Sequence, residues 1–521
     1  GRSTAARAAA VARPFRFLPR SVFSPLEDVT GLRMAWNVCP YAQPQLEFMD
    51  ASLGCVYSPL LSLSDLHIVG YEPIYCSCGA VLNPHCNLDI ELRTWSCPFC
   101  LSCNDIAFLP MSNMVLRNEM LTNNSTIEYV KSHNLSPPSI VFVVDVEAES
   151  GLELDSQLDS LQQALTMLPA DTRVGLLTFG NTCWVHNLSE DIEDMFHPAC
   201  TFDGSRHYSA EQVVQNLGNC TNACFLLPLS ESYSRIISIL DDIKPTQGNV
   251  RHIHHTGERR LRCTGLAVGI ALSLLDFSRP NGGAKVMLLT SGPCTCGPGL
   301  VVSASLSEHM RSHDDIQRAS NSARHVQVAS SYYEDLAARA VRSGYSLDIL
   351  AASIDQMGMY EMKVLADRTG GFILMEYSFE TQTFKDTFLK LFEIDDAGHL
   401  RIGFDTTVTV LTSPELRCWG ASGVFTTSCL TSPRTSERQG QTHWRSCAIG
   451  TNTSFGFYFD LRDCRQNQGF LQFQTTYTHP SGQKRLRITT VRNSYADVAS
   501  REISNAFDCE AAAVLVARQA V

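Results

Sequence analysis

An unbroken apolar run that ends on a carboxylate occupies residues 140–145, as Ile140-Val141-Phe142-Val143-Val144-Asp145. Such a run is typical of a strand that is buried on both faces, as in a parallel sheet covered by helices. The next segment fits a helix, because one face would carry a set of leucines at spacings of four and three: Leu154, Leu158, Leu161, Leu165 and Leu168. The two patterns predict the first strand and the first helix of an α/β domain.

The same alternation continues to about residue 395. Further strands are predicted at 174–179, 285–290, 347–354 and 372–376, and residues 184–186 would form a hairpin with the first of these. Further helices are predicted at 266–275, 332–341 and 359–365, and a last one carries Phe384, Phe388 and Phe392 on one side. Strands that alternate with helices predict a doubly wound, mostly parallel sheet covered on both faces.

The periodicity changes after about residue 400. Apolar and polar residues alternate with a period of two in four segments, which are 407–410, 455–459, 471–477 and 486–491. Gly, Pro, Ser and Asn separate these segments. This pattern predicts an antiparallel β-sandwich.

The composition is that of an ordinary multi-domain globular protein. The 521 residues include 44% hydrophobic and 18% charged residues, which excludes a mainly disordered chain. Lys and Arg number 41 against 53 Asp and Glu, for a net charge of -12, which argues against a general nucleic-acid binder. The apolar runs are too short to span a membrane, so we expect a soluble protein.

Six of the 20 cysteines lie close together, at Cys76, Cys78, Cys86, Cys97, Cys100 and Cys103. A secreted disulfide scaffold would be short and evenly dense in cysteine, and it would begin with a hydrophobic signal. This chain has neither property. We therefore expect the reducing cytosol, with one clustered metal site and mostly buried free thiols.

Two knuckles in this cluster indicate a zinc site. Cys76-x-Cys78 and Cys97-Pro98-Phe99-Cys100 are separated by residues 79–96, a spacing typical of a ribbon-type finger. The predicted ligands of one structural Zn²⁺ are Cys76, Cys78, Cys97 and Cys100. Because the first knuckle is one residue shorter than C-x-x-C, Cys86 or Cys103 could replace one of them. A redox dithiol and unconnected surface thiols are the remaining alternatives.

Asp145 ends the first central strand, where open α/β sheets place ligand sites. In von Willebrand A-type domains this strand leads into D-x-S-x-S, whose side chains bind a divalent ion. The corresponding sequence in this chain is Asp145-Val146-Glu147-Ala148-Glu149, in which both serines of that motif are replaced. We therefore expect Asp145 to be a structural carboxylate that holds no divalent ion.

The segment Arg251 to Arg262 is basic against the acidic background. A solvated loop is the simplest interpretation, and contact with anionic lipid or an acidic partner is the alternative. A third interpretation is that His252, His254 and His255 bind a metal ion. The chain contains no G-x-x-x-x-G-K-[ST], H-E-x-x-H or G-x-S-x-G, so the sequence predicts no active site.

Both ends of the sequence differ from a typical domain. Residues 1–20 contain five arginines and no acidic residue, which fits a disordered arm, sequence from outside the reading frame or a transit peptide. Residues 510–521 fit a helix that stops in mid-pattern. We expect Ala512, Val514, Leu515 and Val516 to lack partners and further sequence to follow Val521.

Short motifs, together with these patterns, resemble the Sec23 family of inner-coat subunits of the COPII vesicle coat. The resemblance runs from about Asp28 to the last residue. Its motifs stand in the family's order: Trp36-Asn37-Val38-x-Pro40, Tyr71-Glu72-Pro73, Ala80-Val81-Leu82-Asn83-Pro84, Trp95-x-Cys97-x-Phe99-Cys100, Val174-Gly175-Leu176-x-Thr178-Phe179-Gly180, Ser291-Gly292-Pro293, Gly297-Pro298-Gly299, Asp355-Gln356-x-Gly358, Ser481-Gly482-Gln483-x-Arg485-x-Arg487 and Phe507-Asp508-x-Glu510-Ala511-Ala512-Ala513.

The resemblance and the patterns together imply a multi-domain α/β plus β architecture. Its expected parts are a disordered or artefactual arm (1–27), the N-terminal part of a β-sandwich (28–70), a zinc finger (71–106), a von Willebrand A-like trunk (125–395), the completion of the β-sandwich (396–500) and the start of an α-helical domain (501–521). A gelsolin-like domain closes the family's order, so the resemblance implies a C-terminally truncated chain.

The resemblance also implies a function. Such proteins bind the cargo-adaptor subunit of the coat and a Sar-family GTPase on the endoplasmic-reticulum membrane, and they stimulate GTP hydrolysis with an arginine from the gelsolin-like domain. We therefore expect a non-enzymatic GTPase activator with no nucleic-acid partner. It would work in the cytoplasm, on the cytosolic face of the acidic membrane and on COPII-coated vesicles, with the outer coat cage as another partner. No arginine in residues 1–521 matches the catalytic position, which is expected outside them.

Two other functions remain open. The sister cargo-adaptor subunit shares the architecture, although the loop Ser291 to Gly299 and the helix start at Phe507 favour the GTPase-activating subunit. A von Willebrand A-type adhesion protein is the second, and the missing D-x-S-x-S motif and signal peptide count against it.

Overall fold

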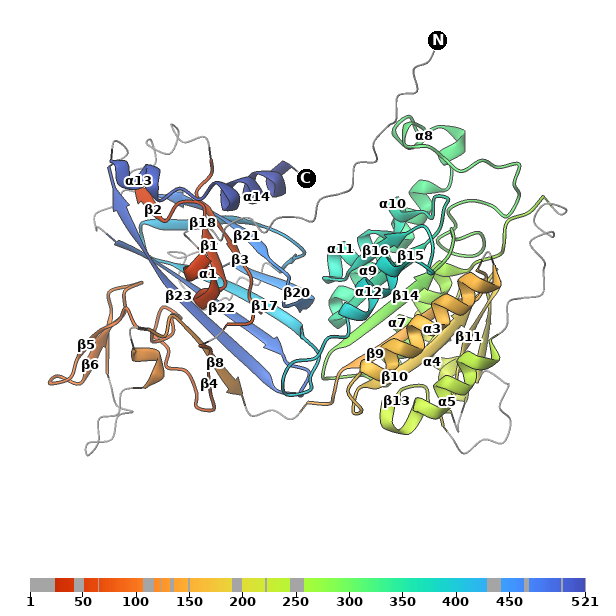
Figure 1. Ribbon diagram of the computed structural model, residues 1–521, viewed down its shortest axis with the longest axis horizontal. Helices are drawn as coiled ribbons and strands as arrows, with labels where there is room; N and C mark the ends of the chain where they lie inside the picture. Colours follow the sequence, from red (N-terminus) through yellow and green to blue (C-terminus); the bar gives the residue numbers. More distant parts are fainter. Residues whose placement is uncertain are drawn as a thin grey trace, which may run out of the picture.

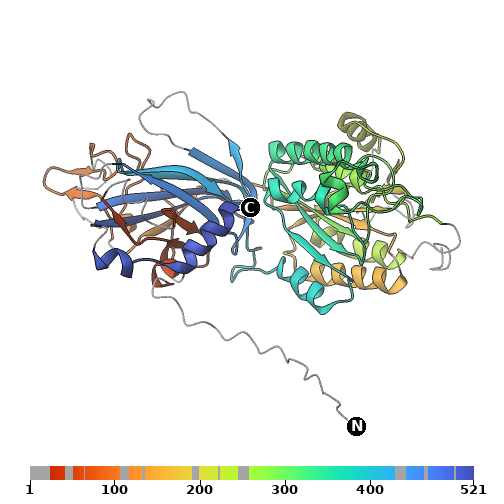
Figure 2. The ribbon, with the colours of Figure 1, turned by 90° about the horizontal axis from the view of Figure 1, so that it is seen from above.

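The computed structural model describes residues 24–41, 51–63, 65–105, 117–121, 123–131, 135–148, 150–189, 199–220, 223–243, 257–428, 442–462, 468–497 and 500–520. These residues form two lobes that lie side by side along the long axis of the molecule (Figure 1). One lobe contains the α/β trunk, and the other contains the β-sandwich with the finger at its far end. Seen from above, the two lobes again lie next to each other (Figure 2).

The trunk is built on an eight-stranded sheet whose centre is parallel. Its order is β12 (Cys200–Asp203), β11 (Thr182–Val185), β10 (Arg173–Phe179), β9 (Ser139–Asp145), β14 (Ala284–Thr290), β15 (Tyr345–Ala352) and β16 (Ile373–Glu376). The strands from β10 to β16 are parallel, whereas β11 and β12 are antiparallel additions, and β13 (Leu227–Pro228) pairs with one end of β10. The predicted parallel sheet and its hairpin are confirmed.

Helices cover both faces of the trunk sheet. One face packs against α3 (Gly151–Met167), α5 (Leu229–Asp242) and α12 (Gln382–Lys390). The other packs against α4 (Ala210–Asn219), α7 (Thr264–Ser278), α9 (Val326–Ser343), α10 (Met359–Met362) and α11 (Val364–Thr369), and α8 (His313–Gln317) lies outside these layers. Side chains of β9 alternate between the two cores, with Phe142 in one and Val143 in the other, which explains its unbroken apolar sequence.

The second lobe is a β-sandwich. Its smaller sheet has the order β1 (Leu32–Met34), β3 (Gly54–Tyr57), β21 (Phe455–Leu461) and β18 (Leu416–Ser422). The larger has the order β19 (Thr426–Ser428), β20 (Thr442–Gly450), β17 (Ile402–Thr412), β22 (Gln468–Thr478), β23 (Lys484–Ala496), β8 (Thr126–Lys131) and β4 (His67–Val69), with β2 (Val38–Pro40) also beside β23. Aromatic rings join the sheets, because the ring centroid of Phe473 lies 4.4 Å from that of Tyr57 and 5.4 Å from that of Phe457.

Two expectations about this lobe were wrong in detail. The trunk was expected to begin at residue 125, but β8 pairs with β23 over Thr126–Lys131 and therefore belongs to the sandwich. The sandwich is also not wholly antiparallel, because β2 runs parallel to β23 and β4 runs parallel to β8. Both parallel strands are only three residues long, too short for a period-two pattern to indicate their direction.

The finger is a three-stranded antiparallel sheet of β5 (Asn87–Asp89), β6 (Thr94–Ser96) and β7 (Cys103–Asp105). A 3-10 turn, η1 (Asn118–Met120), follows the finger in the sequence. Its Met120 packs into the small hydrophobic core of the finger. The fold therefore contains the predicted ribbon-type element.

The ends of the described chain pack on the sandwich lobe. The helix α1 (Ser24–Thr30) overlaps the expected disordered arm at 1–27, of which residues 1–23 lie outside the described residues. The helices α13 (Arg501–Asn505) and α14 (Cys509–Ala520) follow β23. Ala512 and Leu515 of α14 are buried in the sandwich core, so our expectation that they lack partners was wrong, whereas Val514 and Val516 are exposed.

The lobes meet where β20 contacts α11 and β15. Gly370 follows α11 with a φ of +76°, and an added Cβ would lie 2.3 Å from the carbonyl oxygen of Ala448 on β20. Only glycine allows this approach of the two backbones. None of the helices in the described ranges has the length and apolar character needed to cross a bilayer.

Candidate functional site

The sulfur atoms of Cys76, Cys78, Cys97 and Cys100 lie within 4.8 Å of one another. The Sγ atoms of Cys76 and Cys100 are 3.4 Å apart, and those of Cys78 and Cys97 are 3.7 Å apart. A tetrahedral site with Zn–S bonds of about 2.3 Å separates its sulfurs by about 3.8 Å. The donor set and spacing of these four thiols therefore fit one zinc ion.

Turns bring each pair of thiols together. In the first knuckle, the N–H of Cys76 donates to Ala80 O at 2.8 Å and the N–H of Gly79 donates to Cys76 O at 2.9 Å. This turn needs the positive φ of +89° at Gly79. Because Cys78 lies within the turn, one residue between Cys76 and Cys78 is enough to bring both thiols to the same site. In the second knuckle, the N–H of Leu101 donates to Cys97 O at 2.9 Å.

The other two candidates for this set lie outside it. Cys86 is buried, and burial raises the pKa of its thiol to about 12. Cys103 is exposed on β7. Burial opposes ionisation of Cys76, but hydrogen bonds from the N–H of Cys78 and from Asn104 outweigh burial and lower its pKa to about 7. Asn104 Nδ2 donates to Cys76 Sγ at 3.4 Å, a contact that favours a thiolate at this position.

The first knuckle is tied directly to the sandwich. The side-chain amide of Gln472 on β22 accepts from Val81 N at 2.7 Å and donates to Val81 O at 2.9 Å. Gln474, two residues along the same strand, donates to Gly79 O at 2.9 Å. A knuckle fixed by metal would thus hold the finger at a defined position on the larger sheet.

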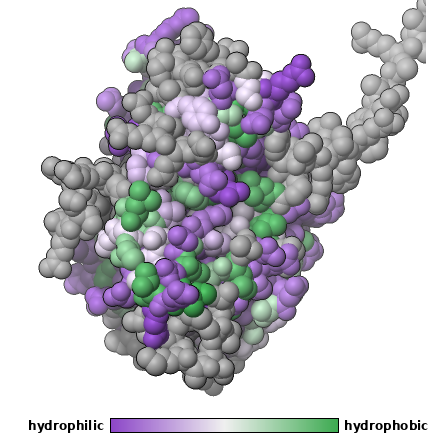
Figure 3. Space-filling model, turned by 90° about the vertical axis from the view of Figure 1, so that its left-hand side faces the viewer, coloured by the Kyte–Doolittle hydropathy of each residue, from purple (hydrophilic) through white to green (hydrophobic). Residues whose placement is uncertain are grey.

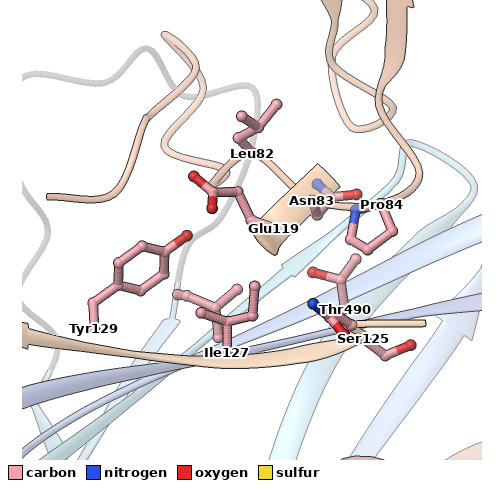
Figure 4. A pocket seen from close by; sticks show the side chains of 10 residues that line it. Leu82, Asn83, Pro84, Glu119, Ser125, Ile127, Tyr129 and Thr490 are labelled. Carbon is pink, nitrogen blue, oxygen red and sulfur yellow. The ribbon is translucent and has the colours of Figure 1, made fainter. Parts of the chain in front are cut away.

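A small pocket lies at the same junction, between the finger and the larger sheet (Figure 4). Leu82, Asn83 and Pro84 line one side, and Ile127, Tyr129 and Thr490 of the sheet line the other, with Glu119 above them (Figure 4). The Glu119 carboxylate accepts from Tyr71 Oη at 2.7 Å and pairs with Arg117 Nε at 2.9 Å. Since its carboxylate is committed to these neighbours, we assign the pocket a packing role.

The finger also exposes apolar side chains, most strongly Leu92 at 74% and Leu101 at 63%. The face of the molecule that carries the finger shows apolar side chains among polar ones (Figure 3).

The second candidate site is the carboxyl end of β9, where Asp145 is fully buried. Its Oδ2 lies 2.9 Å from Arg262 Nε and accepts hydrogen bonds from the N–H and the Oγ of Ser291, both at 2.9 Å. Its Oδ1 accepts from Glu147 N at 2.8 Å. These contacts support the predicted structural role of the Asp145 carboxylate.

Arg262 is the cation of this site and is itself 4% exposed. Its Nη2 donates to the carbonyl oxygen of Glu147 and, at 3.2 Å, to Ser291 Oγ. Gly292 makes room for it, since an added Cβ would lie 2.5 Å from Arg262 Nη1. The guanidinium group thus occupies the space beside Asp145 and neutralises it.

For residues 257–262, the described part of the basic segment, this arrangement corrects our interpretation of a solvated loop. Arg259 donates to the carbonyl oxygens of Ser303, Ser305 and Glu308, and Arg260 pairs with Glu147 at 3.3 Å. Together with Arg262, these arginines fix the end of the segment to the strand-end loops. Residues 251–256, with the three histidines, lie outside the described residues.

The fold thus defines a von Willebrand A-like trunk joined to a β-sandwich that carries a finger. Three models of one family match the chain, which are the Sec23/Sec24 zinc finger at residues 73–107, the Sec23/Sec24 trunk domain at 135–392 and the Sec23/Sec24 beta-sandwich domain at 403–496. The chain belongs to the Sec23/Sec24 family.

One solved structure shares the fold over most of this chain. The human COPII-coat protein Sec24c is 18% identical with a TM-score of 0.70, and the match covers 94% of this chain. The chain spans 64% of the length of that relative. Two weaker matches are a von Willebrand factor type A protein from Catenulispora acidiphila (10% identity, 69% of this chain, 67% of that chain, TM-score 0.39) and the ArnB paralog VWA2 from Sulfolobus acidocaldarius (11% identity, 74% and 73%, TM-score 0.31).

Proposed function

We propose that this chain is the GTPase-activating, Sec23-type inner-coat subunit of the COPII coat. It binds the cargo-adaptor subunit and a Sar-family GTPase, and it recruits the outer coat cage at the acidic cytosolic face of the endoplasmic reticulum. The family membership supports the coat role. The choice of subunit rests on the Sec23-like motifs, which include Ser291-Gly292-Pro293 and the helix start at Phe507.

One structural observation supports the use of Ser291-Gly292-Pro293 in choosing between the two subunits. Ser291 donates to Asp145 from both its N–H and its Oγ, and Gly292 allows the close approach of Arg262. The motif is therefore part of a buried network at the strand end. Arg262 of this network also accepts, through its carbonyl oxygen, from the N–H groups of Thr295 and Cys296, which directly precede Gly297. A loop held in this way is suited to present a rigid surface to a partner.

We further propose that Cys76, Cys78, Cys97 and Cys100 bind one structural Zn²⁺. Four thiolates complete the coordination of the ion and leave no open position for a substrate. The ion would stabilise the finger and, through Val81 and Gln472, its attachment to the sandwich.

The cargo-adaptor subunit is the second candidate. It is favoured by one observation, the fold match to human Sec24c over 94% of this chain. At 18% identity that match reflects the shared fold of the family, so it does not outweigh the motifs.

Reconstitution separates the two functions. A Sar-family GTPase is loaded with GTP on acidic liposomes, and phosphate release is measured with and without the full-length natural protein. A GTPase-activating subunit supplies an arginine in trans, which can accelerate hydrolysis by about 10³–10⁵. A rate unchanged by a folded, zinc-loaded protein that binds the liposomes with the GTPase would overturn the proposed activation.

A further inference from the structure

A pair of cysteine thiols lies at the outer edge of the trunk sheet, where β12 is the terminal strand next to β11. Cys200 is the first residue of β12, the terminal strand of the sheet, and Cys220 is the C-cap residue of α4. Their Sγ atoms are 2.9 Å apart. A disulfide bond separates its sulfur atoms by about 2.05 Å, so these two sulfurs would have to approach each other by roughly 0.9 Å to form one.

The surroundings keep the two thiols facing each other. The Sγ of Cys220 lies 3.2 Å from the carbonyl oxygen of Ala199, which directly precedes β12. The Sγ of Cys200 lies 3.5 Å from the carbonyl oxygen of Asn216, in the last turn of α4. Each thiol is therefore positioned against the backbone of the other's element.

The two cysteines differ in access to solvent. Cys200 is 7% exposed, and burial, followed by its hydrogen bond to Cys220, raises its pKa to about 12. Cys220 is partly exposed. An oxidant from solution therefore reaches Cys220 first, and Cys200 stays protonated until a partner forms beside it.

A metal site is the competing interpretation of two close thiols. Among the described residues, the cluster with at least three suitable ligands is the finger set, and it includes neither Cys200 nor Cys220. Two thiols alone do not close the coordination of a structural zinc ion. The pair is thus better suited to form a covalent bond than to hold a metal.

We propose that Cys200 and Cys220 form a reversible oxidation site that hydrogen peroxide converts to a disulfide. The Cys220 thiolate attacks one peroxide oxygen, the O–O bond breaks, and a sulfenic acid and hydroxide form; the hydroxide takes up a proton to give water. The Cys200 sulfur then attacks the Cys220 sulfur, and its thiol proton leaves with the displaced hydroxide as a second water. Two thiols are oxidised, one peroxide is reduced, and a thiol reductant reverses the change.

The disulfide would join the edge strand to the end of α4, which packs against α7 on one face of the sheet. It would close the segment from 200 to 220 into a covalent loop. Because such a loop restricts the unfolded chain, oxidation should stabilise this edge of the trunk. The site would therefore let peroxide rigidify the side of the trunk remote from the sandwich.

Peptide mapping tests the proposal. The zinc-loaded chain is treated with hydrogen peroxide, remaining thiols are alkylated, and digested peptides are analysed by mass spectrometry without reduction. We expect a linked peptide pair joining Cys200 to Cys220, about 2 Da lighter than the two reduced peptides together. Dithiothreitol should abolish it, and the melting temperature should rise on oxidation.

Three variants make the result specific. Cys220→Ser should lose both the linked peptide and the rise in melting temperature. Cys200→Ser should instead leave a sulfenic acid on Cys220 that dimedone traps. Cys224→Ser removes a neighbouring exposed cysteine and should behave as the unaltered chain. Two results would overturn the proposal. One is that Cys200 and Cys220 both remain reduced, and are fully alkylated, after a peroxide treatment that oxidises Cys224. The other is that the linked peptide pair forms only after the zinc has been released.

Discussion

The guanidinium of Arg262 lies 2.9 Å from the carboxylate of Asp145, and both side chains are almost completely buried at the end of the central strand β9. In von Willebrand A-type domains a divalent ion sits beside the aspartate of this strand. Here a side chain of the same polypeptide supplies the positive charge, and Ser291 and the N–H of Glu147 supply further donors. The strand end is thus a structural centre held together by charge and hydrogen bonds.

Removing the cation should strongly destabilise the trunk. Arg262→Met leaves Asp145 buried without its counter-charge, which costs about 3–5 kcal/mol of unfolding free energy. Urea unfolding measures this loss, and Arg206→Met is the matched control because Arg206 and its partner Asp203 are exposed. The control should cost less than about 1 kcal/mol. The double variant Arg262→Met/Asp145→Asn should recover part of the loss, and failure to do so would show that packing, not charge, is what Arg262 contributes.

The same geometry predicts that divalent ions do not stabilise the trunk through Asp145. Magnesium or calcium at millimolar concentration should leave the melting temperature unchanged, because the guanidinium already occupies the place beside the carboxylate. Differential scanning fluorimetry provides the measurement. A rise that disappears in Asp145→Asn would show that this strand end binds a cation after all.

Metal analysis should find one zinc per chain. Cys97→Ser should lose the ion and lower the melting temperature, since the thiolates supply much of the folding free energy of the finger. Cys103→Ser and Cys86→Ser should keep the zinc, because neither belongs to the set of four close sulfurs. If Cys97→Ser held as much zinc as the unaltered chain, the assignment of Cys97 as a zinc ligand would be wrong. If Cys86→Ser lost the zinc, Cys86 would replace one of the four assigned ligands.

Acid should weaken the sandwich through Glu128. Burial opposes ionisation of this carboxyl, but Arg487, Arg485 and the hydroxyl of Tyr477 outweigh burial and hold its pKa below the ordinary 4.5. Because the pKa of Glu128 is lower in the folded state than in the unfolded state, its ionised carboxylate adds to the free energy of unfolding. This contribution is fully present above about pH 4.5 and is lost as pH falls through the folded-state pKa.

Glu128→Gln should therefore cost about 3 kcal/mol or more at pH 7, and the difference from the unaltered chain should shrink as pH falls below about 4.5. Urea unfolding as a function of pH measures both quantities. Asp314→Asn is the control, because its partner Arg318 and Asp314 itself are exposed. A difference that stays constant with pH would show that Glu128 is not ionised in the folded protein.

Much of the fold was predictable because the strong signals are local. The unbroken run ending at Asp145 marks a strand buried on both faces, and the leucines of α3 mark its helix, so the doubly wound trunk follows from neighbouring residues alone. The four thiols were predictable for the same reason, since each knuckle is a local turn.

What the sequence did not indicate depends on long-range pairing. Arg262 stands 117 positions from Asp145, in a segment whose basic composition suggested a solvated loop. The placement of β8 in the sandwich depends on its pairing with β23, more than 350 positions away, as in Glu128 opposite Arg487. Cys200 and Cys220 carry no motif, and only the packing of β12 beside α4 brings them together.

The most direct test of the proposed identity is partner choice, measured by mass photometry at nanomolar concentration. The 57.5 kDa chain is mixed separately with a purified COPII cargo-adaptor subunit and with a purified GTPase-activating inner-coat subunit. Our account predicts a one-to-one complex, heavier than the cargo-adaptor subunit by the mass of this chain, and no complex with the GTPase-activating subunit. The reverse pattern would contradict the account and identify the chain as a cargo adaptor.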